Sequence, residues 1–249
     1  MSKLSYVGLF FCLLSVGSSS HAGESAPLPA LRAVPFTDVG IADSFWAPRR
    51  ATNRLASIPA NFAMLEKSGN LRNFELAAAK ATNGFTGPVF MDSDLYKALE
   101  AAACSLGTDP DPELARRLDG IIATIAAAQQ PDGYLNTYFI VKEPSLRWKN
   151  LRDWHELYCA GHLFEAAVAH FQATGKRDFL DVAIRLADHI DSVFGAAPGK
   201  RMGYPGHPEI ELALVKLWRV TGQQRYLELA RFFVENRGRR FFAEEHGTP

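Results

Sequence analysis

The fold is decided by a stretch that opens with Trp154-His155-Glu156-Leu157-Tyr158-Cys159-Ala160-Gly161-His162 and closes with Gly203-Tyr204-Pro205-Gly206-His207-Pro208-Glu209-Ile210-Glu211. Each of these motifs places a histidine just before an apolar run that has the spacing of an amphipathic helix. Polar side chains at successive helix starts are one way to line the central cavity of an all-helical domain. We therefore take the rest of the chain as earlier and later turns of the same arrangement.

The helical unit between the motifs recurs at a step of 47 residues. Thr174-Gly175 ends one apolar helix, and Thr221-Gly222 ends its counterpart. A second amphipathic helix follows each stop, from Phe179 in the first copy and from Tyr226 in the second. Because a single helical hairpin cannot bury both of its faces, neighbouring hairpins must stack. The step is near the HEAT-repeat range of about 40–47 residues, so the period alone leaves open a solenoid or a closed ring with inner and outer helices.

The earlier part of the chain extends the same all-α pattern. It contains predicted helices at 43–65 with a kink at Pro59, at 74–80, at 95–106 capped by Asp92-Ser93-Asp94, and at 112–130 capped by Asp109-Pro110-Asp111. Leu135 to Trp148 is expected to be a long connection. We count about seven helices and find no convincing strand pattern after Leu55.

The composition and the N-terminal sequence limit the possible classes of protein. Lys plus Arg and Asp plus Glu both number 27, so the formal charge is zero, and no basic stripe indicates a nucleic-acid partner. Residues 1–22 read as a signal peptide, with Lys3, an apolar run and the cleavage-like Ser20-His21-Ala22. The apolar run is shorter than the roughly 20 residues that span a bilayer, which disfavours an uncleaved anchor. We expect export to the periplasm or the extracellular space and no membrane association after cleavage.

Domain organisation follows from these assignments. Residues 23–35 are expected to be a disordered lead-in, and 36–249 to be the helical domain. After cleavage two cysteines remain, Cys104 and Cys159. Two cysteines do not make a disulfide scaffold, and the sequence leaves open whether they pair.

His155, Cys159 and His162 have the spacing i, i+4 and i+7, which places them on one helix face. Metal binding is one interpretation, and capping and packing near a helix start is the other; we favour packing, because short Cys/His spacings match by chance. A zincin motif is excluded, because the required second histidine is replaced by Cys159.

His207 is a stronger candidate for ligand binding. Gly206 and Pro208 restrict the backbone around it, and a helix is expected to start at about Pro208. An imidazole held at a cavity mouth suits hydrogen bonding to sugar hydroxyls, although a simple helix-start histidine would have the same sequence.

Other polar groups allow two interpretations. The loop from Gln129 to Thr137 has a composition typical of carbohydrate binding or of a solvated turn. Asp92 and Asp94 are either a carboxylate pair for glycoside hydrolysis or a helix cap. Glu209 and Glu211 point to different helix faces, so they are a poor acid/base pair.

Four motifs together resemble the bacterial β-L-arabinofuranosidases of glycoside hydrolase family 127, over nearly all of residues 36–237. They are Asp92-Ser93-Asp94-Leu95-Tyr96-Lys97, Gln130-Pro131-Asp132-Gly133-Tyr134-Leu135-Asn136-Thr137-Tyr138-Phe139, His155-Glu156-Leu157-Tyr158-Cys159-Ala160-Gly161-His162 and Gly203-Tyr204-Pro205-Gly206-His207-Pro208-Glu209-Ile210-Glu211. The resemblance implies an (α/α)6 barrel of six-hairpin glycosidase type. It also implies retaining hydrolysis of terminal β-L-arabinofuranosides of plant glycans, so the expected partner is a carbohydrate.

The resemblance also implies site residues and a cofactor. In the family a zinc-bound cysteine thiolate is the nucleophile, a glutamate is the acid/base, and a glutamate and three cysteines hold the zinc. His155 and His207 fall where the family's histidines contact the sugar, and Pro205 and Gly206 lie beside the second of them. Asn61 stands where the family often has a sugar-binding glutamine.

The chain departs from the family pattern in its catalytic residues. The family's acid/base glutamate and zinc ligands are expected downstream of Pro249, so this chain is expected to hold no catalytic residue and no zinc ligand. We interpret the chain as the N-terminal half of the domain, about three and a half hairpins of an incomplete ring. Alone it is expected to be inactive and, because apolar edges would be exposed, to self-associate.

Two alternatives remain at this point. The chain is also interpretable as a non-catalytic helical-repeat module that binds carbohydrate or protein, which the step of 47 residues favours. Another six-hairpin enzyme, such as an unsaturated glucuronyl hydrolase, is less favoured, because the basic groups that an acidic sugar requires are not clustered.

Overall fold

The structure is a computed structural model that describes residues 33–247. The predicted signal peptide and most of the predicted lead-in lie outside the described residues. Helices account for nearly all regular structure, and within residues 33–247 the β-type pairing consists of one isolated bridge between Phe194 and Arg201. The helices are α1 (Trp46–Thr52), α2 (Ile58–Ser68), α3 (Asn70–Ala78), α4 (Asp92–Thr108), α5 (Pro112–Ala128), α6 (Thr137–Val141), α7 (Glu156–Thr174), α8 (Asp178–Val193), α9 (Ile210–Thr221), α10 (Gln224–Asn236) and α11 (Phe241–His246). Short helical turns η1 (Phe36–Asp38), η2 (Asn53–Ser57) and η3 (Pro144–Leu146) complete the set.

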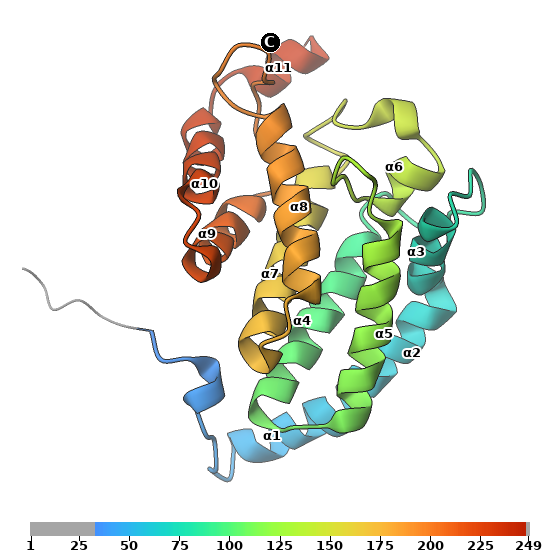
Figure 1. Cartoon of the computed structure of the whole chain (residues 1–249), viewed down its shortest axis with the longest axis vertical. Coiled ribbons are helices and arrows are strands. Elements are labelled where there is room, and N and C mark those ends of the chain that lie inside the picture. Colours follow the sequence, from blue (N-terminus) through green and yellow to red (C-terminus); the bar gives the residue numbers. More distant parts are fainter. Residues whose placement is uncertain (1–32, 248–249) are drawn as a thin grey trace, which may run out of the picture. The chain divides into compact units, whose positions relative to one another are not determined.

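The long helices form two layers. α4, α7 and α9 pack against one another in that order, and each is followed by a partner, α5, α8 or α10, that returns along a second layer (Figure 1). α2 and α3 pack against α4 and α5 at the start of the series. The all-α, partial (α/α)-barrel class is therefore confirmed, with eight helices of nine residues or more in the described part of the chain.

The 47-residue repeat corresponds to two hairpins with the same stop. Gly175 and Gly222 end α7 and α9 in the left-handed conformation, with φ of +72° and +70°. In both copies the threonine before the glycine donates its hydroxyl to a carbonyl four residues back and accepts an N–H two residues ahead. The shared Thr-Gly dipeptide thus terminates both helices by the same local contacts.

Alanines allow the two layers to approach closely. Eight helical alanines of the described residues have no exposed surface: Ala102, Ala103, Ala128, Ala166, Ala167, Ala183, Ala187 and Ala213. Larger side chains such as Leu99, Leu163 and Phe179 fill the remaining space. Close helix approach with few gaps is the packing expected of a stable core.

The predicted helix cap is confirmed at Asp111 and wrong at Asp92, and Asp43 caps the first helix. The Asp43 carboxylate accepts the Phe45 and Trp46 N–H groups, and Asp111 accepts those of Glu113 and Leu114. Asp92 does not cap α4, because its carboxylate accepts the backbone N–H and the hydroxyl of Thr137. A tertiary contact has replaced the cap that the local sequence predicts.

As expected, the first predicted helix is interrupted near Pro59. The interruption is a widened turn directly before α2. Residues Asn53–Ser57 form a π-helical turn in which the Ile58 N–H donates to the Asn53 carbonyl. Pro59 has no N–H to offer the carbonyl four residues before it, so a regular turn cannot be completed there.

The prediction of a long connection from Leu135 to Trp148 is only partly right. The segment contains α6 and η3, and Phe139 is fully buried while Tyr138 packs against the core. The Asn136 side chain accepts the Phe139 N–H at the start of α6.

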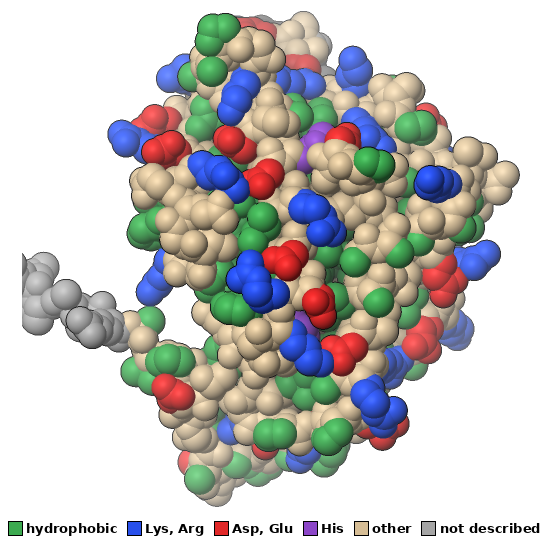
Figure 2. Space-filling view, viewed as in Figure 1, with side chains coloured by type: hydrophobic (Ala, Val, Ile, Leu, Met, Phe, Trp, Pro, Cys, Tyr) green, Lys and Arg blue, Asp and Glu red, His purple; other side chains and the backbone are tan. Residues whose placement is uncertain are grey.

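The surface of the viewed face carries mixed charge. Figure 2 shows Lys and Arg side chains interspersed with Asp and Glu side chains, without a continuous patch of one sign. Among the described residues, the helices are all too short or too polar to cross a bilayer.

Replacing Gly175 or Gly222 with alanine should destabilise the fold by about 1 kcal/mol each, because alanine in the left-handed region costs roughly 1–2 kcal/mol. Space is not the cause, since nothing lies within 4 Å of a Cβ at either position. Gly120→Ala is the matched control: it has equal space but lies inside α5 without a positive φ, and it should be neutral or stabilising. Urea unfolding of the three variants measures this, and equal effects at all three would contradict it.

Candidate functional site

Two loops bring His155 and His207 together. The ring centroids lie 4.5 Å apart, although the residues precede different helices, α7 and α9. His155 has φ +58° and its Nδ1 lies 2.5 Å from the Asp153 carbonyl, so Nδ1 carries the hydrogen and Nε2 is left to meet a ligand. Burial lowers the pKa of His155, as do the nearby His207 and Lys97, so the neutral ring is favoured.

The two loops are fastened by their backbones. The Gly206 N–H donates to the Leu151 carbonyl at 3.0 Å. A Cβ on Gly206 would overlap the backbone of Arg152, so only glycine permits this approach. Pro205 is buried, and its carbonyl accepts Nη2 of Arg237 at 3.1 Å. Of the predicted site residues, His155 and His207 thus present side chains, while Pro205 and Gly206 shape the loop.

Tyr158 and Lys97 lie beside the two histidines, and the sequence reading did not single them out. The Tyr158 ring centroid is 5.6 Å from that of His155 and 5.8 Å from that of His207. Lys97 Nζ lies 4.9 Å from the centre of the Tyr158 ring. A half-buried aromatic face with an adjacent ammonium group and two imidazoles is a typical polar and aromatic lining for a small ligand.

Asn61 belongs to a neighbouring hollow. It lines a space of about 440 Å³ between α2 and α4, together with Asp94 and Lys97. Lys97 also forms a 3.8 Å ion pair with Asp94. Because Lys97 contacts both this hollow and Tyr158, it connects Asn61 with the histidine pair.

The proposed carboxylate pair of Asp92 and Asp94 is not formed. Asp92 is buried and bonded to Thr137, and burial raises its pKa to about 6. Asp94 is in the hollow beside Lys97 instead. Two carboxyl groups with separate partners of this kind do not flank a common bond, so the hydrolytic-pair interpretation is wrong.

The loop from Gln129 to Thr137 uses its polar groups internally. The Gln129 amide donates to the carbonyls of Gly133 and Val182, and Tyr134 is fully buried. Pro131 and Asp132 are exposed at the turn, while the buried side chains of the loop connect α5, α8 and the start of α7.

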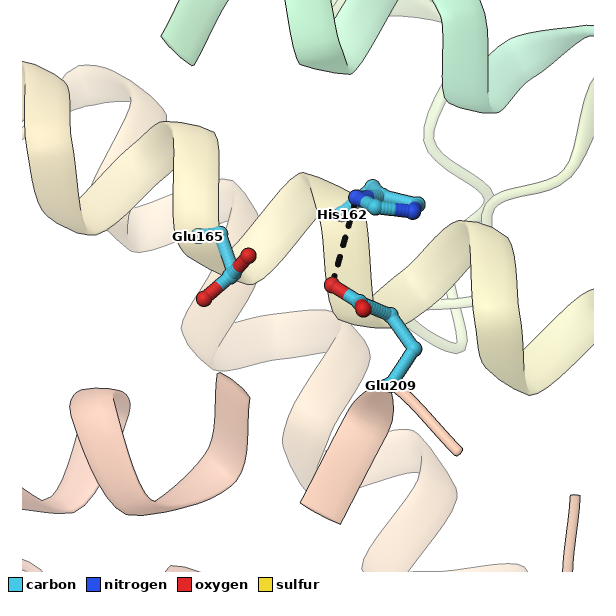
Figure 3. A group of neighbouring side chains, drawn as sticks. All are labelled: His162, Glu165 and Glu209. Atoms are coloured by element: carbon cyan, nitrogen blue, oxygen red, sulfur yellow. Dashed lines mark ion pairs between the residues drawn. The ribbon is translucent and has the colours of Figure 1, made fainter. Parts of the chain in front are cut away.

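His162, Glu165 and Glu209 form a second polar cluster (Figure 3). His162 Nδ1 lies 3.2 Å from Glu209 Oε1, and Glu165 pairs with Lys216. Burial lowers the pKa of His162 to about 4 and raises that of Glu209 to about 7, the latter also because Glu165 is adjacent. His162 and Glu209 are 47 residues apart, so the repeat itself predicts that they lie side by side on neighbouring helices.

This cluster is the one group among the described residues whose donors could hold a metal. It does not fit the zinc site that the resemblance implies, which requires a glutamate and three cysteines. Both cysteines are free: Cys104 is exposed, and Cys159 is buried with Sγ 3.6 Å from the Phe90 carbonyl. His155, Cys159 and His162 likewise do not converge, because His155 precedes the body of α7.

Glu156 is a buried carboxylate beside His155. Its oxygens accept the Tyr134 hydroxyl at 2.5 Å and the Trp148 N–H at 2.7 Å. Burial raises the pKa of Glu156 to about 8, although Tyr134, Trp148, Arg147 and Arg201 all favour the charged form.

The raised pKa of Glu156 predicts a pH dependence of stability. The folded protein retains a proton that the unfolded chain releases near pH 4.5, so this contribution is complete below pH 4.5 and is lost as the pH rises through about 8. Glu156→Gln should reduce the decline of unfolding free energy between pH 5.5 and 7.5, which lies between the two pKa values, by up to about 1.4 kcal/mol per pH unit, the value for one proton.

Urea unfolding at several pH values measures this slope. Glu228→Gln, at an exposed position of α10, is the control and should leave the slope unchanged. An identical slope in wild type and Glu156→Gln would show that Glu156 is ionised throughout.

Comparisons with known proteins identify the family of the chain. Residues 38–247 match the family model described as the β-L-arabinofuranosidase, GH127 catalytic domain. A non-reducing end β-L-arabinofuranosidase from Bifidobacterium longum subsp. longum is 44% identical over 185 residues, which cover 72% of this chain and 28% of that protein.

Solved structures give the same family. A GH127 β-L-arabinofuranosidase from Geobacillus stearothermophilus T6 superposes with a TM-score of 0.82 at 48% identity, over 85% of this chain and 35% of that one. A second GH127 β-arabinofuranosidase superposes with a TM-score of 0.79 at 39% identity, over 86% of this chain and 36% of that one. The chain thus spans about a third of the length of these relatives. With the family model matched over most of its residues, the chain belongs to the β-L-arabinofuranosidase catalytic-domain family GH127.

Proposed function

We propose that the protein is a glycoside hydrolase that releases terminal β-L-arabinofuranosyl units from plant glycans, and that this chain supplies part of the sugar-binding surface. The observation that carries the proposal is the pair of imidazoles of His155 and His207, 4.5 Å apart and fixed by the Gly206–Leu151 backbone contact. The names of two relatives support the choice of sugar, because the proteins from Bifidobacterium longum and Geobacillus stearothermophilus are both β-L-arabinofuranosidases.

The lining suits a neutral furanose. His155 Nε2 is free to accept a hydroxyl hydrogen, because Nδ1–H is used by Asp153. The Tyr158 ring provides an aromatic surface for carbon-bound hydrogens, and the Lys97 ammonium, which lies over one face of that ring, provides a donor. A few oriented polar groups on an aromatic lining provide specificity with modest affinity.

Several further expectations belong to the same proposal. Zinc, held by a glutamate and cysteines outside the described residues, would supply the chemistry that activates a thiolate nucleophile. Export to the periplasm or the extracellular space fits an enzyme acting on plant glycans. Self-association of the chain is supported by exposed apolar side chains, among them Trp46, Leu55 and Met64.

Sugar binding by this chain tests the proposal directly. Methyl β-L-arabinofuranoside should bind with a dissociation constant in the millimolar range, as expected of a single sugar on a partly open surface, and methyl β-L-arabinopyranoside more weakly. His155→Ala and His207→Ala should each weaken binding about tenfold, which is about 1.4 kcal/mol for one lost hydrogen bond. Isothermal titration calorimetry or ligand-observed NMR measures these constants.

Arg231→Ala is the matched control, since Arg231 is an exposed residue of α10 paired with Glu235, and it should bind like wild type. Absence of furanoside binding in a folded wild-type chain would overturn the sugar-binding role. A protein ligand captured in its place would favour the helical-repeat binding module instead.

A further inference from the structure

We propose that Glu156 is a positioning residue for His155: its buried carboxyl group closes the loop that ends at His155 and so sets the direction of the imidazole ring. The sugar-binding consequence rests on the proposed function above. The structural consequence, the orientation and tautomer of His155, does not.

The carboxyl group of Glu156 accepts from two donors and has little access to solvent. Only 4% of the residue is exposed, and Tyr134, which donates to Oε1, is fully buried. Oε2 accepts the Trp148 N–H. Glu156 therefore lies behind the histidine pair and holds the connection before α7 rather than contacting a ligand.

Trp148 is fixed through both its backbone carbonyl and its indole ring. Nη1 of Arg201 donates to its carbonyl, and its indole N–H lies 3.4 Å from Nε2 of His189. His189 in turn has Nδ1 at 3.0 Å from the Asp132 carbonyl, which makes Nδ1 its donor and leaves Nε2 as an acceptor. The Trp148 end of the loop is thus an anchor, and Glu156 ties the start of α7 to it.

Backbone strain explains why the loop needs the hydrogen bond between Glu156 and Trp148. Three residues other than glycine have positive φ in the described chain: Lys80, Trp148 and His155, the last two at +60° and +58°. The Glu156–Trp148 hydrogen bond closes a loop with these two residues at its ends. Each left-handed residue costs roughly 1–2 kcal/mol, so surrounding contacts must stabilise both.

The orientation of the His155 ring depends on the conformation of this loop. Its Nδ1–H donates to the carbonyl of Asp153, inside the closed segment, and its ring contacts Phe90 and Tyr158 on either side. If the loop relaxed, the Asp153 carbonyl would turn away and the imidazole would lose both its tautomer and its direction. Glu156 would then affect ligand binding without touching the ligand.

The test compares three variants by two measurements. Glu156→Leu removes both hydrogen bonds at similar volume, Glu156→Gln keeps an acceptor for the Trp148 N–H, and Tyr134→Phe removes one bond. Long-range ¹H–¹⁵N NMR of the histidine rings reports whether His155 holds its hydrogen on Nδ1. Titration with methyl β-L-arabinofuranoside reports binding.

We expect a mixed His155 tautomer and about tenfold weaker binding in Glu156→Leu, recovery of both in Glu156→Gln, and an intermediate result in Tyr134→Phe. In a double variant with His155→Ala, Glu156→Leu should weaken binding no further, because both act through the same ring. Tyr226→Phe is the matched control, since Tyr226 is also fully buried and its hydroxyl donates to a carboxylate, that of Asp188, away from the histidines.

The outcomes separate the two proposals. An unchanged His155 tautomer in Glu156→Leu and Tyr134→Phe would overturn the positioning role; if Glu156→Leu fails to fold, Tyr134→Phe alone decides. A tautomer change in chains that bind no furanoside, wild type included, would support the positioning role and overturn the sugar-binding function.

Discussion

The contact between the loop before α7 and the loop before α9 is the constraint on which the site depends. The Gly206 N–H bonds to the Leu151 carbonyl where there is no room for a side chain on Gly206. This approach fixes His207 relative to His155 before any ligand is present. A preformed pair of polar groups binds a weakly interacting ligand better than a mobile pair, because less conformational ordering is required on binding.

The layers of the fold explain why polar chemistry gathers at one end of the first layer. α4, α7 and α9 pack in sequence, and α7 and α9 are equivalent units of a repeat. Equivalent positions then become neighbours, as His162 and Glu209 do, and Gly161 lets the start of α9 approach so closely that a Cβ there would lie 2.9 Å from the Ile210 nitrogen. His155 and His207 precede this cluster in the sequence, at the starts of α7 and α9, so the histidine pair and the buried polar cluster lie on the same two neighbouring helix starts.

Features encoded by neighbouring residues were predictable from the sequence. The left-handed glycines after Thr174 and Thr221, the Asp111 cap and the interruption at Pro59 all depend on contacts within a few residues. The family resemblance also selected His155 and His207, which the structure brings together. The roles of Asp92 and Glu156 were not predictable, because their partners Thr137 and Tyr134 are distant in the sequence and tertiary contacts override the local preference for a cap. Lys97 and Tyr158 were not predicted as site residues, because a lysine or a tyrosine alone does not distinguish a binding site from ordinary protein surface.

The widened turn at Asn53–Ser57 has a consequence for how the N-terminal helices can vary. A π-turn holds one residue more than a regular turn, so it shifts the phase of everything before it by about 100° relative to everything after it. Removing a single residue there would restore a continuous helix and rotate the side chains of α1, including Trp46 and Arg50, to a different face while α2 kept its buried Phe62 and Leu65. A relative whose aligned sequence lacks one residue here would therefore have an N-terminal helix that follows the same path but is rotated about its own axis.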